Sequence, residues 1–214
     1  MGAIQNRVHR ETPGAAGGSH RSMRYLIAPA ITAAIGLGAH VALADTVTPQ
    51  NTNDVVASSN VSFVLGGTTV TCTSSSFTVM TPGSSTTPGT PVCMKVTSLP
   101  TFGGCKERLS GFNISATITT SGTWNFCLAG NGTAQLIAPG GGITIMASAL
   151  GVQCKGVSGA ATILGTYDNA TWTATFTSQT VPFTTSGGFP CPSGNSGSFS
   201  GSYITNPHLS VSNP

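Results

Sequence analysis

The sequence predicts an all-β protein: a single antiparallel β-sandwich or β-barrel-like domain of about ten short strands, preceded by a signal-peptide helix. Three observations support this fold class. Apolar and polar residues alternate with a period of two along several segments, as they do in strands with one buried face. Turn-forming residues recur about every ten residues, a spacing typical of sandwiches and barrels. No segment after residue 44 shows the apolar period of a helix.

The segment 23–44, MRYLIAPAITAAIGLGAHVALA, has the features of a signal peptide. Arg24 precedes an apolar run, and Ala42-Leu43-Ala44 forms a small-x-small cleavage site before Asp45. A retained transmembrane anchor is the alternative. The run is short for a bilayer span and no basic cluster follows it, so we favour cleavage after Ala44 and export of the mature chain.

The rest of the chain divides into three segments. Residues 1–22 are polar, Gly-rich and unpatterned, and we expect them to be disordered or to precede a true start of translation at Met23. Residues 45–54 form a flexible lead-in. Residues 55–214 are numerous enough for a single disulfide-bonded β-domain with its own core.

The expected strands follow from the alternation along the chain. In the clearest one, Phe112, Ile114, Ala116 and Ile118 alternate with polar residues. Another has Trp172, Ala174 and Phe176 on one face and threonines on the other. The segments expected as strands are 55–65, 68–73, 77–79, 92–99, 112–118, 123–128, 134–138, 143–150, 160–167, 171–177, 181–184 and 198–205.

Three segments are expected as loops. Residues 81–91, TPGSSTTPGTP, contain prolines that would remove the hydrogen-bond donors of a central strand. Residues 100–111 carry the one charge cluster of the mature chain, Lys106-Glu107-Arg108, which we expect in a solvated turn. Residues 186–198 form a Gly- and Ser-rich loop that Cys191 would tie down.

The mature chain has few charged residues and no net charge, because the four basic residues after residue 44 are balanced by four acidic ones. Nucleic-acid binding needs a basic footprint, which is absent, so no nucleic-acid partner is expected. Electrostatic attachment to anionic lipid is not expected, for the same reason. These charged residues are Lys95, Lys106, Arg108 and Lys155, and Asp45, Asp54, Glu107 and Asp168.

An even number of cysteines in an exported chain predicts disulfides rather than a metal site. No CxxC motif occurs, and the one histidine after residue 44 is His208. Spacing alone does not choose among the possible pairings. The six cysteines are Cys72, Cys93, Cys105, Cys127, Cys154 and Cys191.

No combination of residues predicts catalysis. His208 is the one candidate base for a hydrolase triad and lies near the C-terminus. Glu107 and Asp168 could be proposed as a glycosidase pair, but both fall in expected turns. Gly140-Gly141-Gly142 lacks the Lys and the helix of a phosphate-binding loop. We therefore expect no catalytic residue, no cofactor and no metal.

The leading hypothesis is a secreted or cell-envelope-associated, non-enzymatic β-domain. One alternative is a binding module for a neutral ligand, such as a glycan or cell-wall polymer, although the partner could also be another envelope protein. A further alternative is a β-barrel in an outer mycolate layer, which alternation and low charge fit but short strands do not. The rings that could stack on a sugar are Trp124, Trp172, Tyr167 and Tyr203, and alternation favours both tryptophans in the core.

Four short motifs occur between about Val61 and Thr205: TCTSSS at 71–76, FGGC at 102–105, GTYDN at 165–169 and GSY at 201–203. With these motifs the chain resembles a group of small secreted proteins of high-GC actinobacteria that have no assigned biochemical function. The resemblance implies no catalytic residues.

The resemblance also implies two disulfides, Cys72–Cys105 in the N-terminal half and Cys154–Cys191 in the C-terminal half. Cys93 and Cys127 would then pair with each other, which departs from the pattern of the group.

Overall fold

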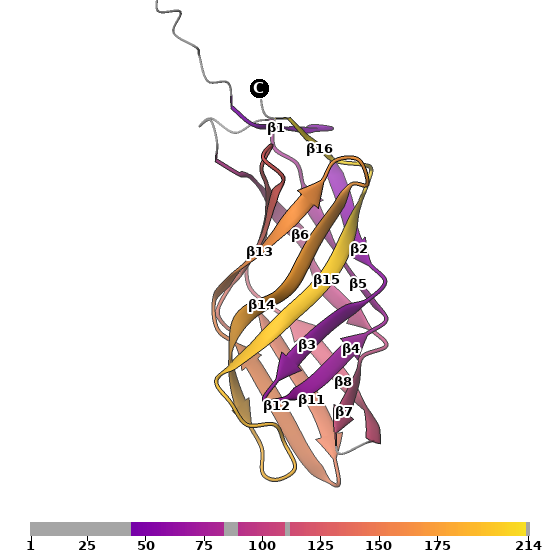
Figure 1. Ribbon diagram of the computed structural model, residues 1–214, viewed down its shortest axis with the longest axis vertical. Helices are drawn as coiled ribbons and strands as arrows, with labels where there is room; N and C mark the ends of the chain where they lie inside the picture. The colour runs from indigo at the N-terminus through magenta and orange to yellow at the C-terminus, as the bar shows by residue number, and fades with distance from the viewer. Residues whose placement is uncertain (1–43, 84–89, 110–111, 213–214) are drawn as a thin grey trace, which may run out of the picture. The chain divides into compact units, whose positions relative to one another are not determined.

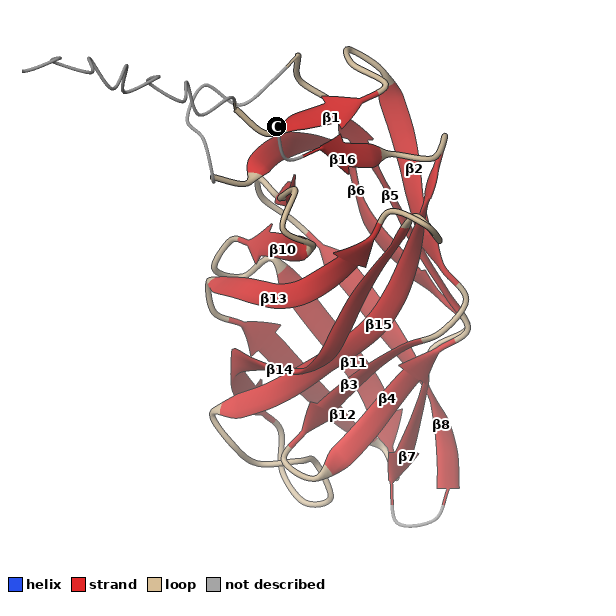
Figure 2. Cartoon of the chain, turned by 45° about the horizontal axis from the view of Figure 1, so that its top comes forward, coloured by secondary structure: helices blue, strands red, loops and turns tan. Residues whose placement is uncertain are grey.

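Antiparallel β-strands make up the part of the chain that the structure describes, and no helix occurs there (Figures 1 and 2). A computed structural model describes residues 44–83, 90–109 and 112–212. The strands are β1 (Thr46–Thr48), β2 (Asn53–Ser58), β3 (Val61–Leu65), β4 (Thr68–Cys72), β5 (Ser74–Met80), β6 (Val92–Gly103), β7 (Lys106–Leu109), β8 (Phe112–Thr120), β9 (Asn125–Leu128), β10 (Thr133–Ala138), β11 (Ile143–Ala149), β12 (Val152–Ser158), β13 (Ala161–Asp168), β14 (Thr173–Ser186), β15 (Ser196–Asn206) and β16 (Ser210–Ser212).

The strands close into a barrel, and their pairings form two rings that share β14 and β15. One ring runs β15-β2-β5-β6-β9-β10-β13-β14. The other runs β15-β3-β4-β7-β8-β11-β12-β14. A separate two-stranded sheet joins β1 to β16. Figure 1 shows β14 and β15 crossing the barrel side by side.

The two shared strands are long enough to serve both rings. The first half of β14 pairs with β13 and its second half with β12. Between the halves, the register with β15 shifts between Phe176 and Gln179, and Ser178 there has a φ of 46°. A β-bulge of this kind bends a strand and increases its twist, which lets one strand follow both rings. On its other edge, β15 pairs first with β3 and then with β2.

The barrel interior is filled with side chains that form one hydrophobic cluster. Aromatic side chains from both rings of strands contact one another in an unbroken series. Their centroids are 5.2 to 6.2 Å apart, the spacing that aromatic pairs prefer. This interior is therefore a packed core rather than a channel. In order of contact, the series is Phe102, Phe63, Phe199, Phe176, Tyr203, Phe77 and Phe126.

Three disulfides cross-link the barrel: the two that the resemblance implied, and a third between the two remaining cysteines. Cys72–Cys105 ties β4 to the turn between β6 and β7. Cys93–Cys127 joins directly opposite residues of β6 and β9. Cys154–Cys191 ties β12 to the loop that follows β14.

The all-β antiparallel class predicted from the sequence is confirmed, but residues 44–83, 90–109 and 112–212 alone contain sixteen strands, where we expected about ten. The signal-peptide segment lies outside the described residues, except for Ala44. No helix of the described part is long and apolar enough to cross a membrane.

Two expected irregular segments contain strands. Residues 45–54, expected as a flexible lead-in, contribute β1 and the start of β2. Residues 100–111, expected as a turn, contain the end of β6 and the whole of β7. In both cases the stabilising partner lies elsewhere in the chain: β1 pairs with β16, and β7 pairs with β4 as well as β8.

Candidate functional site

Three of the four candidate stacking rings are buried. Trp124 and Tyr203 are each 1% exposed and Tyr167 is 5% exposed. Their polar atoms bond inside the protein: Trp124 Nε1 donates to the Ser121 carbonyl at 2.9 Å, and the Tyr167 hydroxyl donates to the Leu209 carbonyl at 2.6 Å. Desolvation raises the pKa of both tyrosines. In this structure these rings present no face to an outside ligand.

The fourth ring, Trp172, is half-buried and stacks on His208. The two ring centroids are 3.5 Å apart and the planes are inclined by 5°. The carbonyl of Trp172 accepts a hydrogen bond from the Thr205 amide at 3.1 Å. His208 thus covers one face of Trp172 and the four candidate rings do not form a common platform.

The acidic residues considered for catalysis do not come together either. Glu107 points into the barrel from β7 and is 3% exposed, and burial raises its pKa. Asp168 caps the turn between β13 and β14: its Oδ1 accepts from the Ala170 amide at 2.8 Å and its Oδ2 from the Thr171 hydroxyl at 2.9 Å. These hydrogen bonds lower the pKa of Asp168. The two carboxyl groups belong to different rings of the barrel.

Two further carboxyl groups are buried in the described part of the chain, each with one oxygen that has no partner there. Asp45 Oδ2 accepts from the Gly130 amide at 3.0 Å, and Asp54 Oδ2 accepts from the Thr52 hydroxyl at 2.9 Å. Burial raises the pKa of Asp54, and the bond from Thr52 opposes this in part. The described residues contain no group of three or more side chains arranged to hold a metal ion.

An open groove of about 610 Å³ lies on the outer surface, where β15 changes its partner from β3 to β2. The pairing with β3 ends at Gly201 and the pairing with β2 begins at Ile204. The turn between β2 and β3 therefore lies beside a short stretch of β15 that pairs with neither strand. Gly201 lines the groove with its backbone, since a Cβ there would point into the core, 3.2 Å from the ring of Tyr203. The polar residues that line the groove are Ser58, Ser59, Asn60, Ser62, Thr71, Thr175, Thr177, Ser200 and Ser202.

We call the groove lined by these residues the hydroxyl groove. Several of its hydroxyls are oriented by hydrogen bonds within the protein. The Ser58 hydroxyl donates to the Asn60 carbonyl at 2.9 Å, and the Thr175 and Ser202 hydroxyls lie 3.3 Å apart. Ser200 Oγ accepts from the Ser178 amide at 2.9 Å. None of the polar residues lining the groove is charged, so the groove offers neutral donors and acceptors.

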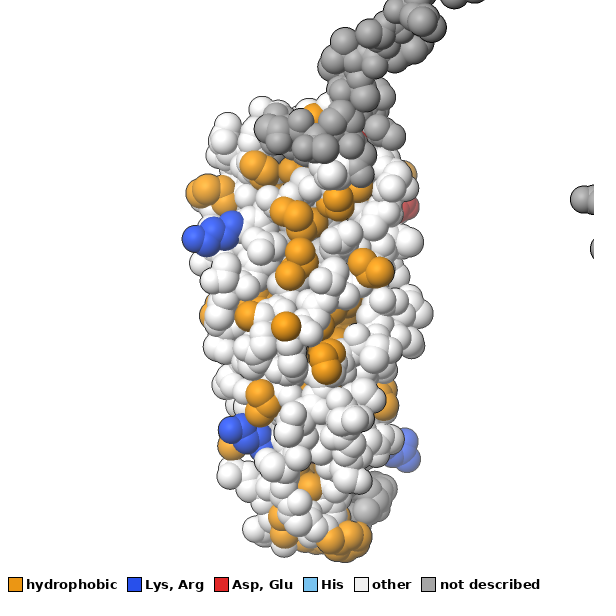
Figure 3. Space-filling model, turned by 90° about the vertical axis from the view of Figure 1, so that its left-hand side faces the viewer, with side chains coloured by type: hydrophobic (Ala, Val, Ile, Leu, Met, Phe, Trp, Pro, Cys, Tyr) orange, Lys and Arg blue, Asp and Glu red, His pale blue; other side chains and the backbone are white. Residues whose placement is uncertain are grey.

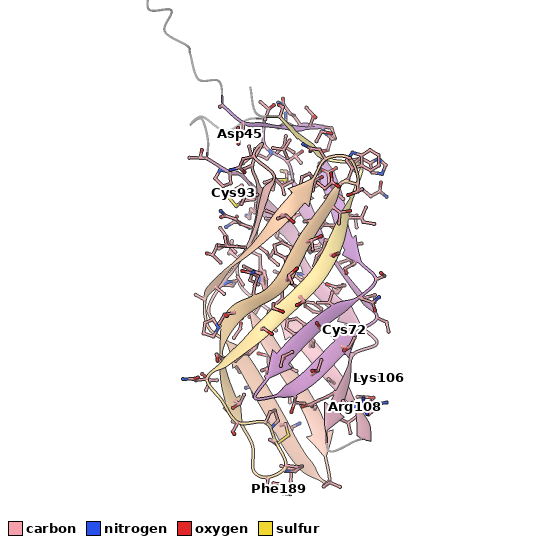
Figure 4. All side chains as sticks on the ribbon, viewed as in Figure 1. Asp45, Cys72, Cys93, Lys106, Arg108 and Phe189 are labelled. Carbon is pink, nitrogen blue, oxygen red and sulfur yellow. A yellow bond between two sulfur atoms is a disulfide. The ribbon has the colours of Figure 1, made fainter. Side chains whose placement is uncertain are left out.

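A second hollow, of about 480 Å³, lies on the outer face of β4, β7 and β8. Its cations, Lys106 and Arg108, are exposed on the outer face of β7, and Figure 4 labels both. Sequence reasoning placed these residues in a turn and missed them as a site. The available signal was two cations spaced two residues apart, which a strand places on one face. The lining residues of this basic hollow are Thr69, Thr71, Thr73, Gly104, Lys106, Arg108 and Asn113.

Charge is sparse elsewhere too. Figure 3 shows one face of the molecule, on which a few basic side chains stand out among uncharged ones.

Comparison with protein-family models, with curated proteins and with solved structures finds no match, so the function of the chain has to be argued from its own geometry.

Proposed function

We propose that the chain is an exported, non-enzymatic β-domain that binds a hydroxyl-rich polymer, such as a cell-wall glycan, on the outer surface of the barrel. The hydroxyl groove is the observation that carries this proposal. Its volume of about 610 Å³ lies within the range of ligand sites in proteins and suits a few units of a polymer. Neutral hydroxyl and amide groups both donate and accept hydrogen bonds, as the hydroxyls of a sugar do.

Export is supported by the sequence and by the cross-links together. Segment 23–44 resembles a signal peptide, and β1 begins at Thr46, two residues after the expected cleavage site at Ala44. The three disulfides fit an oxidising compartment outside the cytoplasm. The proposed location is therefore outside the cell or in its envelope.

A binding role is favoured over catalysis because the candidate catalytic groups have structural contacts. His208 stacks on Trp172, and Asp168 holds a turn. Glu107 is buried inside the barrel, where it lines a small cavity of about 20 Å³ with room for about one water molecule.

A location inside an outer membrane is not proposed. A lipid-facing barrel needs an apolar outer band. On β14 the buried positions include Ala174, Phe176 and Val181, whereas Thr177 and Thr184 are exposed. This is the alternation of a barrel with its apolar face inward.

The test uses the full chain, exported through its own signal and purified from the medium. Binding to purified peptidoglycan and to dextran is measured by co-sedimentation and calorimetry. Ser202→Tyr should fill the groove and lower the affinity by about tenfold or more. Thr162→Tyr, an exposed strand position outside the groove, is the matched control. Equal binding by the Ser202 variant and the parent would contradict the proposal, as would binding of neither polymer. Mass spectrometry of the same sample tests cleavage after Ala44.

A further inference from the structure

The strand register places the two cations of the basic hollow among hydroxyl and amide groups. Lys106 lies directly opposite Thr71 of β4, and Arg108 lies between Thr69 of β4 and Asn113 of β8. Directly opposite residues have Cβ atoms about 5 Å apart, and alternate residues of a strand are about 7 Å apart. An anion resting between the two cations would also be within reach of neutral hydrogen-bond donors.

The positive charge of the hollow is not neutralised by any described residue. Neither Lys106 nor Arg108 has an ion-pair partner in that part of the chain. Their neighbour Glu107 points to the other face of β7 and is buried in the barrel. Two exposed cations without a counter-charge are a suitable site for a phosphate or carboxylate.

Covalent and steric features hold the hollow in shape. The Cys72–Cys105 disulfide joins the strand that carries Thr71 to the residue before Lys106. Gly104 has a φ of +61°, and a Cβ there would lie 2.2 Å from Thr73 Oγ1, so a side chain would strain the backbone and displace the Thr73 hydroxyl. The Thr73 amide donates to the Gly103 carbonyl at 3.0 Å. A binding site whose groups are fixed in advance loses less entropy when the ligand binds.

The basic hollow adjoins the hydroxyl groove. Thr71 lines both, and it pairs with Ser62, which also lines the groove. A chain-like ligand that lies in the groove therefore reaches Lys106 and Arg108 by crossing β4.

We propose that Lys106 and Arg108 form an anion subsite of the hydroxyl groove, so that the ligand is a glycan that carries phosphate or carboxylate groups. This inference rests on the proposed function and makes it more specific. Arg108 would bind the anion through two parallel hydrogen bonds and Lys106 as a point charge. Thr69, Thr71 and Asn113 would complete the shell with neutral bonds.

The experiment compares a neutral polymer with two anionic derivatives of the same backbone. Affinities of the exported protein for dextran, phosphorylated dextran and carboxymethyl dextran are measured by calorimetry at low salt. Lys106→Gln/Arg108→Gln removes the subsite, and Lys95→Gln/Lys155→Gln removes the same charge at two exposed positions outside it. Vesicles of phosphatidylglycerol test whether a lipid headgroup is the source of the anion. Circular dichroism and thermal melting confirm that each variant is folded.

We expect at least one anionic dextran to bind about tenfold more tightly than plain dextran. The preference should disappear in the Lys106/Arg108 variant, remain in the Lys95/Lys155 variant, and weaken with salt. Equal affinities for charged and neutral dextrans would overturn the anion subsite while leaving the groove standing. A charge preference that survives in the Lys106/Arg108 variant would also overturn it, as would binding to vesicles and to no anionic dextran. Failure to bind any polymer would overturn the proposed function as well.

Discussion

Removal of the Cys72–Cys105 disulfide tests how the basic hollow is held. The double variant Cys72→Ala/Cys105→Ala opens a loop whose ends are 33 positions apart. In the chain-entropy model this loop length corresponds to about 12.5 cal/mol/K, or about 3.7 kcal/mol at room temperature. Cys72 is fully buried and Cys105 is 7% exposed, so loss of the sulfur atoms adds roughly 1 kcal/mol of packing.

A matched control is available in Cys93→Ala/Cys127→Ala, because that loop has a separation of 34. The control should lose a similar free energy of unfolding, but it lies away from β4 and β7. We therefore expect both variants to be destabilised by about 4–5 kcal/mol. The Cys72/Cys105 variant alone should lose its preference for anionic dextran.

Guanidinium denaturation followed by circular dichroism measures the loss in stability. Each variant should also show a larger m-value than the parent, because its unfolded chain is less constrained. A loss below about 1 kcal/mol in the Cys72/Cys105 variant would refute the loop-closure argument. An equal loss of anion preference in both variants would refute the role of the crosslink in shaping the hollow.

Three further predictions concern buried or half-buried groups. Burial raises the pKa of Glu107, so the folded state keeps this proton to a higher pH than the unfolded chain does. The contribution of this group to stability is therefore greatest below the usual carboxyl pKa and falls as the pH rises through the pKa of the folded state. Glu107→Gln should reduce that fall and be more stable than the parent near neutral pH. Thermal melts recorded across pH measure both effects. Tyr203→Phe removes a hydrogen bond of 3.0 Å to the Ser75 hydroxyl and should cost about 1–2 kcal/mol in urea denaturation. Combined with Ser75→Ala it should cost less than the sum of the single changes, and strict additivity would count against this bond. In Trp172→Phe the remaining fluorescence comes from buried Trp124, so iodide should quench it far less than in the parent, and strong quenching would contradict the burial of Trp124.

The period-two pattern was a sound guide where a strand pairs with its neighbours in the sequence. The expected strand 112–118 lies within β8, and the alternation of Ala174 and Phe176 with threonines is found in β14. Both strands pair with the strand just before them in the chain. Local pattern and local pairing agree in these cases.

The pattern failed where the partner is remote or where a strand bends. We expected two strands at 171–177 and 181–184, but the bulge after Phe176 joins them into one. Glu107 was expected in a solvated turn, because a carboxylate with charged neighbours gives no local sign that it will be buried. The two cavities could not be predicted either, since the basic hollow depends on the pairing of β4 with β7 and the groove on the change of partner along β15.

In the described part of the chain, β15 follows every other strand of the barrel, and this order determines when the barrel can close. Residues 196–206 complete both rings, because β15 pairs with β14 on one edge and with β2 and β3 on the other. β2 and β3 are far from β15 in the sequence. During synthesis from the N-terminus, neither ring can close until the residues of β15 have left the ribosome. Such non-local pairing makes folding slow. Truncation before Ser196 should therefore leave one continuous open sheet, running from β3 through β14 to β2, rather than a shortened barrel, because β14 still joins β12 to β13.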